Sequence, residues 1–425
     1  MLAGAAVLCV AGAAPGAAYA APEPVPAYRE ADGAKKVAGA ASTADAPLIE
    51  PGGAYLDTVS PGERFYKLNL DARSSVYVSA VVRPGADAKI GYSDDVEVDV
   101  MTTGGKSCPG SPGQGSFQGR PQTVSVVGMR RLQEDADCQE AGVYYVKVTR
   151  DALKDSDQSP WPVELVVHRE PGLKSGSAPA VAPSGWPSAT PAAPADQAVA
   201  RSGGTGFNDA RALGAGVWRD ELRPGQTRFY RVPLDWGRQL AVTAELAGAK
   251  MTRSSGYASD GLALTLYSPY RGQVGDKDTT YDGKQASVGL GLTPPVAYEN
   301  RFSTDAWTRS VGVAGWYYVA VTMGPKVGEF TENASPVPLT LRVSVQGQAA
   351  AAPPYAESLT AAGFGVGGAD LAAAKDGLTA PEAAEAADTR SLMRLVAAGG
   401  FGTGAVLLLG LGGWIWLARR GATSG

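Results

Sequence analysis

Two octapeptides decide the fold of this 425-residue chain: GVYYVKVT at residues 142–149 and GWYYVAVT at residues 315–322. Apolar and polar residues alternate along both, which is the period of a strand with one buried face. The side chains expected to face a core are Tyr144, Val146 and Val148 in the first copy and Tyr317, Val319 and Val321 in the second. The recurrence therefore predicts one β-strand used in two equivalent places.

Two further pairs of segments recur in the same order. PGERFYKL at residues 61–68 is matched by PGQTRFYRV at 224–232, and SPWPVEL at 159–165 is matched by SPVPLTL at 335–341. Pro-Gly, Gly-Gly and Asp-rich breaks separate the alternating segments, and neither copy sustains the spacing of an amphipathic helix. The chain is therefore predicted to be all-β, with one module used twice.

Composition sets the expected boundaries. The modules are predicted over residues 47–170 and 207–346, and stretches rich in Ala, Pro, Ser and Gly surround them. Such stretches bury too little apolar area to order themselves. We therefore expect a disordered lead-in over 21–46, a linker over 171–206 and a stalk over 347–394.

The N-terminal residues 1–20 are predicted to be a signal peptide. The stretch is apolar and closes in Ala18-Tyr19-Ala20, so cleavage is expected between Ala20 and Ala21. No basic residue precedes it, which leaves open a start further upstream or a weaker signal. Cys9 follows Leu8, whereas a lipoprotein signal has a small residue there.

Residues 395–418 carry no charge and are predicted to form a transmembrane helix, since about 20 apolar residues span a bilayer. Trp414 and Trp416 are typical of the interface, and Arg419 and Arg420 begin a cytoplasmic tail over 419–425. Together with the export signal, this predicts a single-pass type I protein of the cell membrane with an extracellular ectodomain.

Cys108 and Cys138 are expected to form a disulfide. Cys9 is removed with the signal peptide, and the other two cysteines of the chain lie in an oxidising compartment. The second module has no cysteine, so the bridge belongs to an insertion and not to the shared fold.

The strand patterns carry a resemblance. A Phe-Tyr strand after Pro-Gly, followed later by Gly-x-Tyr-Tyr-Val-x-Val, resembles bacterial pre-peptidase C-terminal (PPC) modules. The resemblance implies two tandem, non-catalytic, jelly-roll-like β-sandwich modules. With the opening at Tyr55–Gly62 and the C-terminal anchor, the chain is similar to membrane-anchored surface proteins of high-GC Gram-positive bacteria. Relatives of that group are labelled von Willebrand factor A-containing, but the metal-adhesion motif Asp-x-Ser-x-Ser is absent from this sequence.

Two candidate sites lie on strands. Trp316 and Tyr318 occupy the side opposite the predicted core and are candidates for a recognition patch, although a core strand alone explains the pattern. The carboxylates of Asp94, Asp95, Glu97 and Asp99 are weak candidates for Ca²⁺ ligands. A solvated strand face is the alternative, and a D-x-D-x-D-G loop is absent from the sequence.

The predicted function is non-enzymatic binding of a protein or glycan partner at the cell surface, with no cofactor. The single histidine, His168, lies at a predicted strand end without a catalytic motif, and the net charge of −4 without a basic run argues against nucleic acid. An accessory or structural subunit of a membrane or secretion complex is the alternative, and a His-independent hydrolase using paired carboxylates is a remote one. Specific recognition is expected where the copies differ, in the Cys108–Cys138 insertion and the loop at 268–310.

Overall fold

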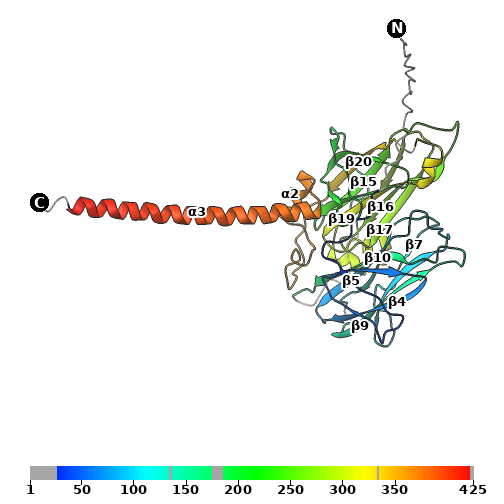
Figure 1. Ribbon diagram of the computed structural model, residues 1–425, viewed down its shortest axis with the longest axis horizontal. Coiled ribbons are helices and arrows are strands. Elements are labelled where there is room, and N and C mark those ends of the chain that lie inside the picture. Colours follow the sequence, from blue (N-terminus) through cyan, green and yellow to red (C-terminus); the bar gives the residue numbers. More distant parts are fainter. Residues whose placement is uncertain (1–25, 134–135, 175–184, 333–334, 422–425) are drawn as a thin grey trace, which may run out of the picture.

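The computed structural model describes residues 26–133, 136–174, 185–332 and 335–421, without the side chains of 391–392, 394–406 and 416–421 in its last helix. Within these residues the chain forms four five-stranded sheets, which pair into two sandwiches (Figure 1). The predicted signal peptide and the Ala20–Ala21 cleavage site lie outside the described residues. The all-β prediction is confirmed for both modules.

Module one contains two sheets. The spatial order in the first is β1 (Lys35–Lys36), β3 (Ala54–Val59), β10 (Trp161–Pro171), β5 (Ser74–Val82) and β8 (Val124–Arg130). The order in the second is β2 (Leu48–Ile49), β4 (Gly62–Leu70), β9 (Gly142–Asp151), β6 (Asp95–Thr102) and β7 (Gly113–Ser116).

Module two repeats this topology strand for strand. Its first sheet has the order β11 (Val199–Ala200), β13 (Gly216–Leu222), β20 (Val337–Gln346), β15 (Gln239–Leu246) and β18 (Ala286–Leu290). Its second has the order β12 (Arg211–Ala212), β14 (Thr227–Leu234), β19 (Gly315–Met323), β16 (Ala258–Tyr267) and β17 (Gln273–Tyr281). The same short parallel strands begin each sheet, so the repetition covers the whole sandwich.

The helices are η1 (Tyr298–Phe302), α1 (Ala306–Arg309), η2 (Pro325–Glu329), α2 (Gly368–Asp376) and α3 (Ala380–Gly421). The first three are single turns in loops of module two. Helix α3 leads away from the sandwiches (Figure 1). In the part of the chain that the structure describes, no helix meets the length and hydropathy needed to cross a membrane.

The repeated octapeptides form β9 and β19, and each contains a tyrosine corner. The Tyr144 hydroxyl donates to the Glu140 carbonyl at 2.8 Å, and the Tyr317 hydroxyl donates to the Val313 carbonyl at 2.9 Å. A buried tyrosine that bonds the backbone a few residues upstream fixes the corner of a β-sandwich. Gly142 and Gly315 precede these tyrosines with φ of 156° and 152°, values that favour glycine. The octapeptide thus encodes a strand and the turn that leads into it.

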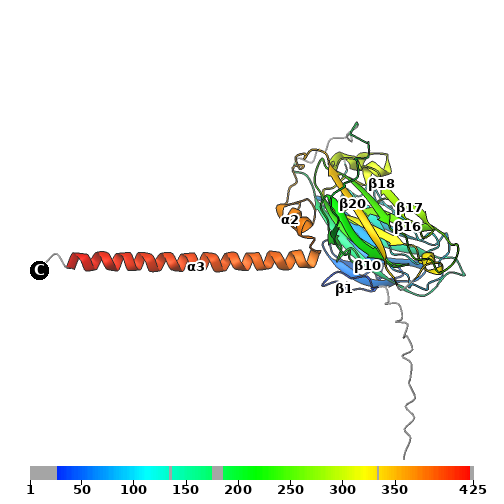
Figure 2. The same cartoon turned by 90° about the horizontal axis from the view of Figure 1, so that it is seen from above.

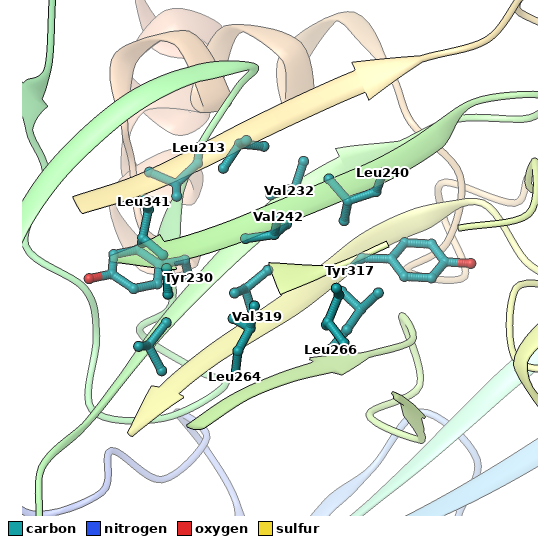
Figure 3. Close-up of a cluster of buried hydrophobic side chains, with 14 of the residues drawn as sticks. Leu213, Tyr230, Val232, Leu240, Val242, Leu264, Leu266, Tyr317, Val319 and Leu341 are labelled. Atoms are coloured by element: carbon teal, nitrogen blue, oxygen red, sulfur yellow. The ribbon is translucent and has the colours of Figure 1, made fainter. Parts of the chain in front are cut away.

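The expected core faces are confirmed. In module two Tyr317 and Val319 of β19 pack among Tyr230 and Val232 of β14 and Val242 of β15 (Figure 3). In module one Tyr144, Val146 and Val148 are buried in the equivalent cluster. Each fully buried aliphatic side chain stabilises the fold by roughly 1.5–3 kcal/mol.

The lead-in and the linker were predicted to be unstructured, and the structure corrects this for the parts that it describes, residues 26–46 and 185–206. Gly39 and Gly203 precede the predicted modules, and their N–H groups donate to Asp57 at 2.6 Å and to Asp220 at 2.8 Å. The same carboxylates accept the hydroxyls of Tyr66 at 2.8 Å and Tyr230 at 2.6 Å. Two-residue strands such as β1 and β11 are too short to produce a periodic sequence signal, but their backbones complete each sheet.

The predicted stalk over 347–394 is also corrected in its first part. Tyr355 and Phe364 are buried, and Arg211 donates to the Gly377 carbonyl at 3.0 Å. This segment runs along the sandwiches before α3 begins (Figure 2). Single buried aromatic residues are enough to fix an Ala- and Gly-rich stretch against the modules. They leave no periodic pattern of apolar residues from which sequence analysis could predict this.

The two sandwiches pack face to face. The outer face of the β1-β3-β10-β5-β8 sheet contributes Tyr77 and Val81, and the outer face of the β12-β14-β19-β16-β17 sheet contributes Phe229 and Ala320. Tyr77 stacks on Tyr270 of module two with ring centroids 4.2 Å apart. The modules therefore form a stack of four sheets. The outward-facing residues of the two inner sheets form the interface between the modules.

Candidate binding site between the modules

Two buried carboxylates of β10 point from module one into module two. Glu170 accepts two hydrogen bonds from Arg301, at 2.8 and 3.1 Å, one from Tyr77 at 2.6 Å and one from Tyr355 at 2.7 Å. The side chains of Glu170 and Arg301 are 1% and 3% exposed. A bidentate buried pair of this kind fixes orientation as well as distance.

Glu164 makes the second buried contact, six residues earlier on the same face of β10. It accepts from Arg271 at 2.5 Å and from the Asn208 amide at 3.1 Å. The backbone N–H of Ala31 donates to the same carboxylate at 3.1 Å. The segment before module one therefore adds a hydrogen bond to the Glu164–Arg271 pair. Tyr355, which follows module two, adds one to the Glu170–Arg301 pair.

A cavity of about 520 Å³ lies at this junction, beside Tyr77, Tyr270 and Arg301. Module one lines it with residues between the two cysteines: Gly110, Ser111, Pro112, Met129, Arg131 and Gln133. Module two adds Phe302, Ser303, Thr304, Arg309, Ser310, Gly312 and Val313. The predicted disulfide between Cys108 and Cys138 is confirmed. The expectation that it belongs to an insertion is wrong, because β7 and β8 lie between the two cysteines and module two repeats them as β17 and β18. Most of the lining comes from the β6–β7 connection of module one, residues 103–112, and the β18–β19 connection of module two, residues 291–314.

The pKa values of two arginines in the cavity, Arg301 and Arg131, are shifted in opposite directions. Burial alone would lower the pKa of Arg301, but the carboxylate of Glu170 raises it well above its ordinary value. Burial lowers the pKa of Arg131, and the nearby charges of Arg301 and Arg309 lower it further, against the opposing effect of Tyr77 and Tyr270. Among the described residues no carboxylate pairs with Arg131.

The acidic residues on and beside β6 do not converge on one point. Asp94 accepts from the N–H groups of Gly91 and Leu153 and from the Ser156 hydroxyl, at 2.8, 2.9 and 3.0 Å. Asp95 accepts from the Gln114 amide at 2.8 Å, Glu97 lies 3.8 Å from the Lys147 ammonium, and Asp99 accepts from the Ser107 hydroxyl at 2.7 Å. Across the described residues no group of three potential metal ligands is found. Each carboxylate has a protein partner of its own.

Trp316 and Tyr318 lie on the predicted side of β19, but that side is covered. The Trp316 indole donates to Asp370 of α2 at 2.9 Å, and the Arg231 guanidinium lies 4.1 Å from its ring centroid. Tyr318 packs edge-on against Phe207 with centroids 5.2 Å apart. The expected open patch is therefore corrected to a packing surface, because helix α2 and module one occupy it.

His168 lies within β10 and not at a frayed strand end. Its ring centroid is 6.1 Å from that of Phe364, in the interface between the modules. Burial, with a smaller contribution from Arg271, lowers the pKa of His168 to about 3. The side chain is therefore neutral at physiological pH.

Sequence analysis located the two variable loops but missed the charges that join the modules. Glu164, His168 and Glu170 alternate with core residues of β10, which is also the pattern of a solvated strand face. The available signal was a difference between the copies, since Thr340 occupies the place of Glu164 in the repeated segment.

The fold and the cavity define a tandem β-sandwich protein with a polar site between its modules. No protein-family model and no curated protein matches the chain. Among solved structures, it is similar to the pre-peptidase C-terminal domain of a collagenase from Bacillus anthracis, with 14% identity, a TM-score of 0.20, and coverage of 29% of this chain and 94% of that one.

A second similar structure is the CBM22-1-CBM22-2 tandem domain of Paenibacillus barcinonensis Xyn10C, with 13% identity, a TM-score of 0.19, and coverage of 70% of this chain and 92% of that one. A third is the ANXUR2 extracellular domain from Arabidopsis thaliana, with 7% identity, a TM-score of 0.19, and coverage of 71% and 86%. TM-scores of this size carry no argument about function, so the functional argument rests on the cavity.

Proposed function

We propose that this protein is a non-catalytic, membrane-anchored extracellular binding protein whose two modules hold a saccharide of a surface partner in the cavity between them. The anchor is assigned to residues 395–418 from their uncharged sequence and the basic pair that follows. Helix α3 leads this segment away from the sandwiches (Figure 1), and Leu407, Leu408 and Leu409 are 68–77% exposed. Exposed leucines in this number need an apolar environment.

The observation that carries the proposal is the origin of the cavity. The two connections that supply most of the lining differ in length between the copies. The β6–β7 connection of module one covers residues 103–112, against 268–272 in module two, and the β18–β19 connection of module two covers residues 291–314, against 131–141 in module one. Loops placed by a rigid β scaffold are where such proteins carry binding residues. Two connections that are each longer in one copy than in the other, and that meet at one cavity, are better explained by a ligand than by folding.

The size and lining favour a saccharide over a protein surface. A volume of about 520 Å³ falls in the range of small-ligand sites, roughly 300–1,000 Å³. Guanidinium groups, hydroxyls and the Phe302 ring provide donors and an apolar contact in one place. The described lining contains no carboxylate, and the pair of carboxylates on which most glycosidases depend is therefore not supplied there.

An oligosaccharide array probed with the full chain tests the proposal. The Thr304→Trp variant places an indole at an exposed lining position and is expected to abolish binding, whereas Thr252→Trp, at an exposed position outside the cavity, should not. A chain whose residues 395–418 are replaced by an unrelated helix should bind the same oligosaccharides. Loss of binding in the helix-replaced chain would favour a subunit of a membrane complex. Equal binding by the Thr304→Trp variant would exclude this cavity.

A further inference from the structure

The arginines of the cavity outnumber the carboxylates that neutralise them. Arg131, Arg301 and Arg309 all line the cavity. Of these three arginines, only Arg301 forms an ion pair with Glu170. Arg301 also donates to the carbonyls of Tyr298 and Gly312, at 2.9 Å each. Protein groups therefore accept from all three nitrogens of its guanidinium, and Glu170 neutralises its charge.

Backbone carbonyls orient Arg131 and Arg309, but among the described residues neither arginine forms an ion pair with a carboxylate. Arg131 donates one hydrogen bond to the Arg301 carbonyl, and its Nε–H is buried with no partner among the described residues. Arg309 donates to the carbonyls of Ser303 and Thr304, at 3.1 and 3.2 Å. The neighbouring Asp305 uses its carboxylate to accept from the N–H and hydroxyl of Thr308, at 2.8 and 2.7 Å, and feels the charge of Arg309 without forming an ion pair with it. Backbone carbonyls orient both arginines, and among the described residues neither arginine has a carboxylate in direct contact.

We propose that the cavity binds an oxyanion between Arg131 of module one and Arg309 of module two, so that the saccharide of the proposed function is an acidic one. A guanidinium presents a planar set of N–H donors that matches the oxygens of a carboxylate or sulfate group. Like charges that are partly withdrawn from water repel one another strongly, and a bound anion removes that cost. Because the two arginines belong to different modules, the anion also links the modules.

The inference rests on the proposed function, and the experiment separates the two. Binding of glucuronate, glucose and inorganic sulfate to the full chain is measured by titration calorimetry. Glucuronate is expected to bind at least ~10-fold more tightly than glucose, since hydrogen bonds to charged groups are worth more than neutral ones. Arg131→Gln and Arg309→Gln should each weaken glucuronate binding by ~10-fold or more. Arg253→Gln, which removes the same charge from an exposed position outside the cavity, should leave it unchanged.

The other outcomes are also decisive. Glucose and glucuronate binding equally, with loss of both in the Thr304→Trp variant only, would overturn the oxyanion and keep the saccharide. Sulfate binding as tightly as glucuronate, with the same dependence on both arginines, would support the oxyanion site and remove the saccharide. Absence of binding by all three probes would overturn the inference. Arg309→Lys, which keeps the charge but not the planar fork, should bind glucuronate with intermediate affinity and guards against a folding defect in the glutamine variants.

Discussion

Replacing Glu170 by leucine tests whether the modules are held together by buried charge. The substitution removes the carboxylate that accepts from Arg301, Tyr77 and Tyr355 and leaves the Arg301 guanidinium 3% exposed without a counter-charge. Breaking a buried ion pair from one side costs about 3–5 kcal/mol, because the remaining charge stays desolvated. Glu170→Leu is therefore expected to lower the free energy of unfolding by about that amount.

The chain offers a matched control in which the same chemistry is accessible to solvent. Arg342 donates to both oxygens of Glu245, at 2.7 and 3.2 Å, but these side chains are 26% and 22% exposed. Glu245→Leu, also on a strand, should cost no more than ~1 kcal/mol, since water solvates the arginine that remains. Geometry is similar in the two pairs, so the difference between the variants reports burial.

Equilibrium urea unfolding of the full chain, followed by tryptophan fluorescence, measures both variants. The double variant Glu170→Leu with Arg301→Leu should recover most of the loss, because replacement of a whole buried pair by apolar residues is often close to neutral. A Glu170→Leu cost no larger than the Glu245→Leu cost would refute the reasoning. So would a double variant as unstable as the single one.

Three further predictions address other features. The pKa of His168 is lowered to about 3 from 6.5, so the unfolded chain binds a proton that the folded chain does not, and stability should fall as the pH drops below 6.5. His168→Leu should remove about 1.6 kcal/mol of the loss between pH 6.5 and 5, measured by urea unfolding at each pH. Reduction of the disulfide should raise the intact mass by about 2 Da, and an unchanged mass would contradict the bridge. The double variant Cys108→Ala with Cys138→Ala should lower the free energy of unfolding by roughly 3–4 kcal/mol in the chain-entropy model. Tyr317→Phe removes the hydroxyl that donates to the Val313 carbonyl and should cost about 1–3 kcal/mol, and Tyr145→Phe, on the opposite face of the equivalent strand, should cost less than ~0.5 kcal/mol by thermal unfolding.

The sandwiches could be predicted from sequence because their signals are local. Tyr144, Val146 and Val148 alternate within one strand, and the same face recurs at Tyr317, Val319 and Val321. The order of the repeated segments fixed the number of modules. The segments before and after them were mispredicted, because the ordering of Gly39 and Tyr355 depends on partners far away in sequence, such as Asp57 and Glu170.

The site could be predicted only in part, for a related reason. Differences between the copies pointed to the part of each module that lines the cavity, and the cysteine pair followed from the predicted compartment and the count. Trp316 and Tyr318 were placed on the correct side of their strand but assigned to solvent, since alternation gives the side and not what covers it. Arg131 and Arg309 have no motif around them, and their proximity arises only when the modules pack.

The repeat itself explains why the interface forms on one face of module one. The outward positions of β10 carry Glu164, His168 and Glu170, whereas the equivalent strand β20 carries Thr340, Ser344 and Gln346 at the corresponding places and Arg342 at the place of Val166. The two carboxylates of β10 are buried against Arg271 and Arg301 of module two, whereas Arg342 of β20 pairs with Glu245 of its own module and stays partly exposed. The contact joins the first sheet of module one to the second sheet of module two, and a head-to-tail contact of this kind can extend to a third copy when every copy carries the same faces. Only β10 carries the buried carboxylates, so the contact ends at two modules and the loops that line the cavity meet once.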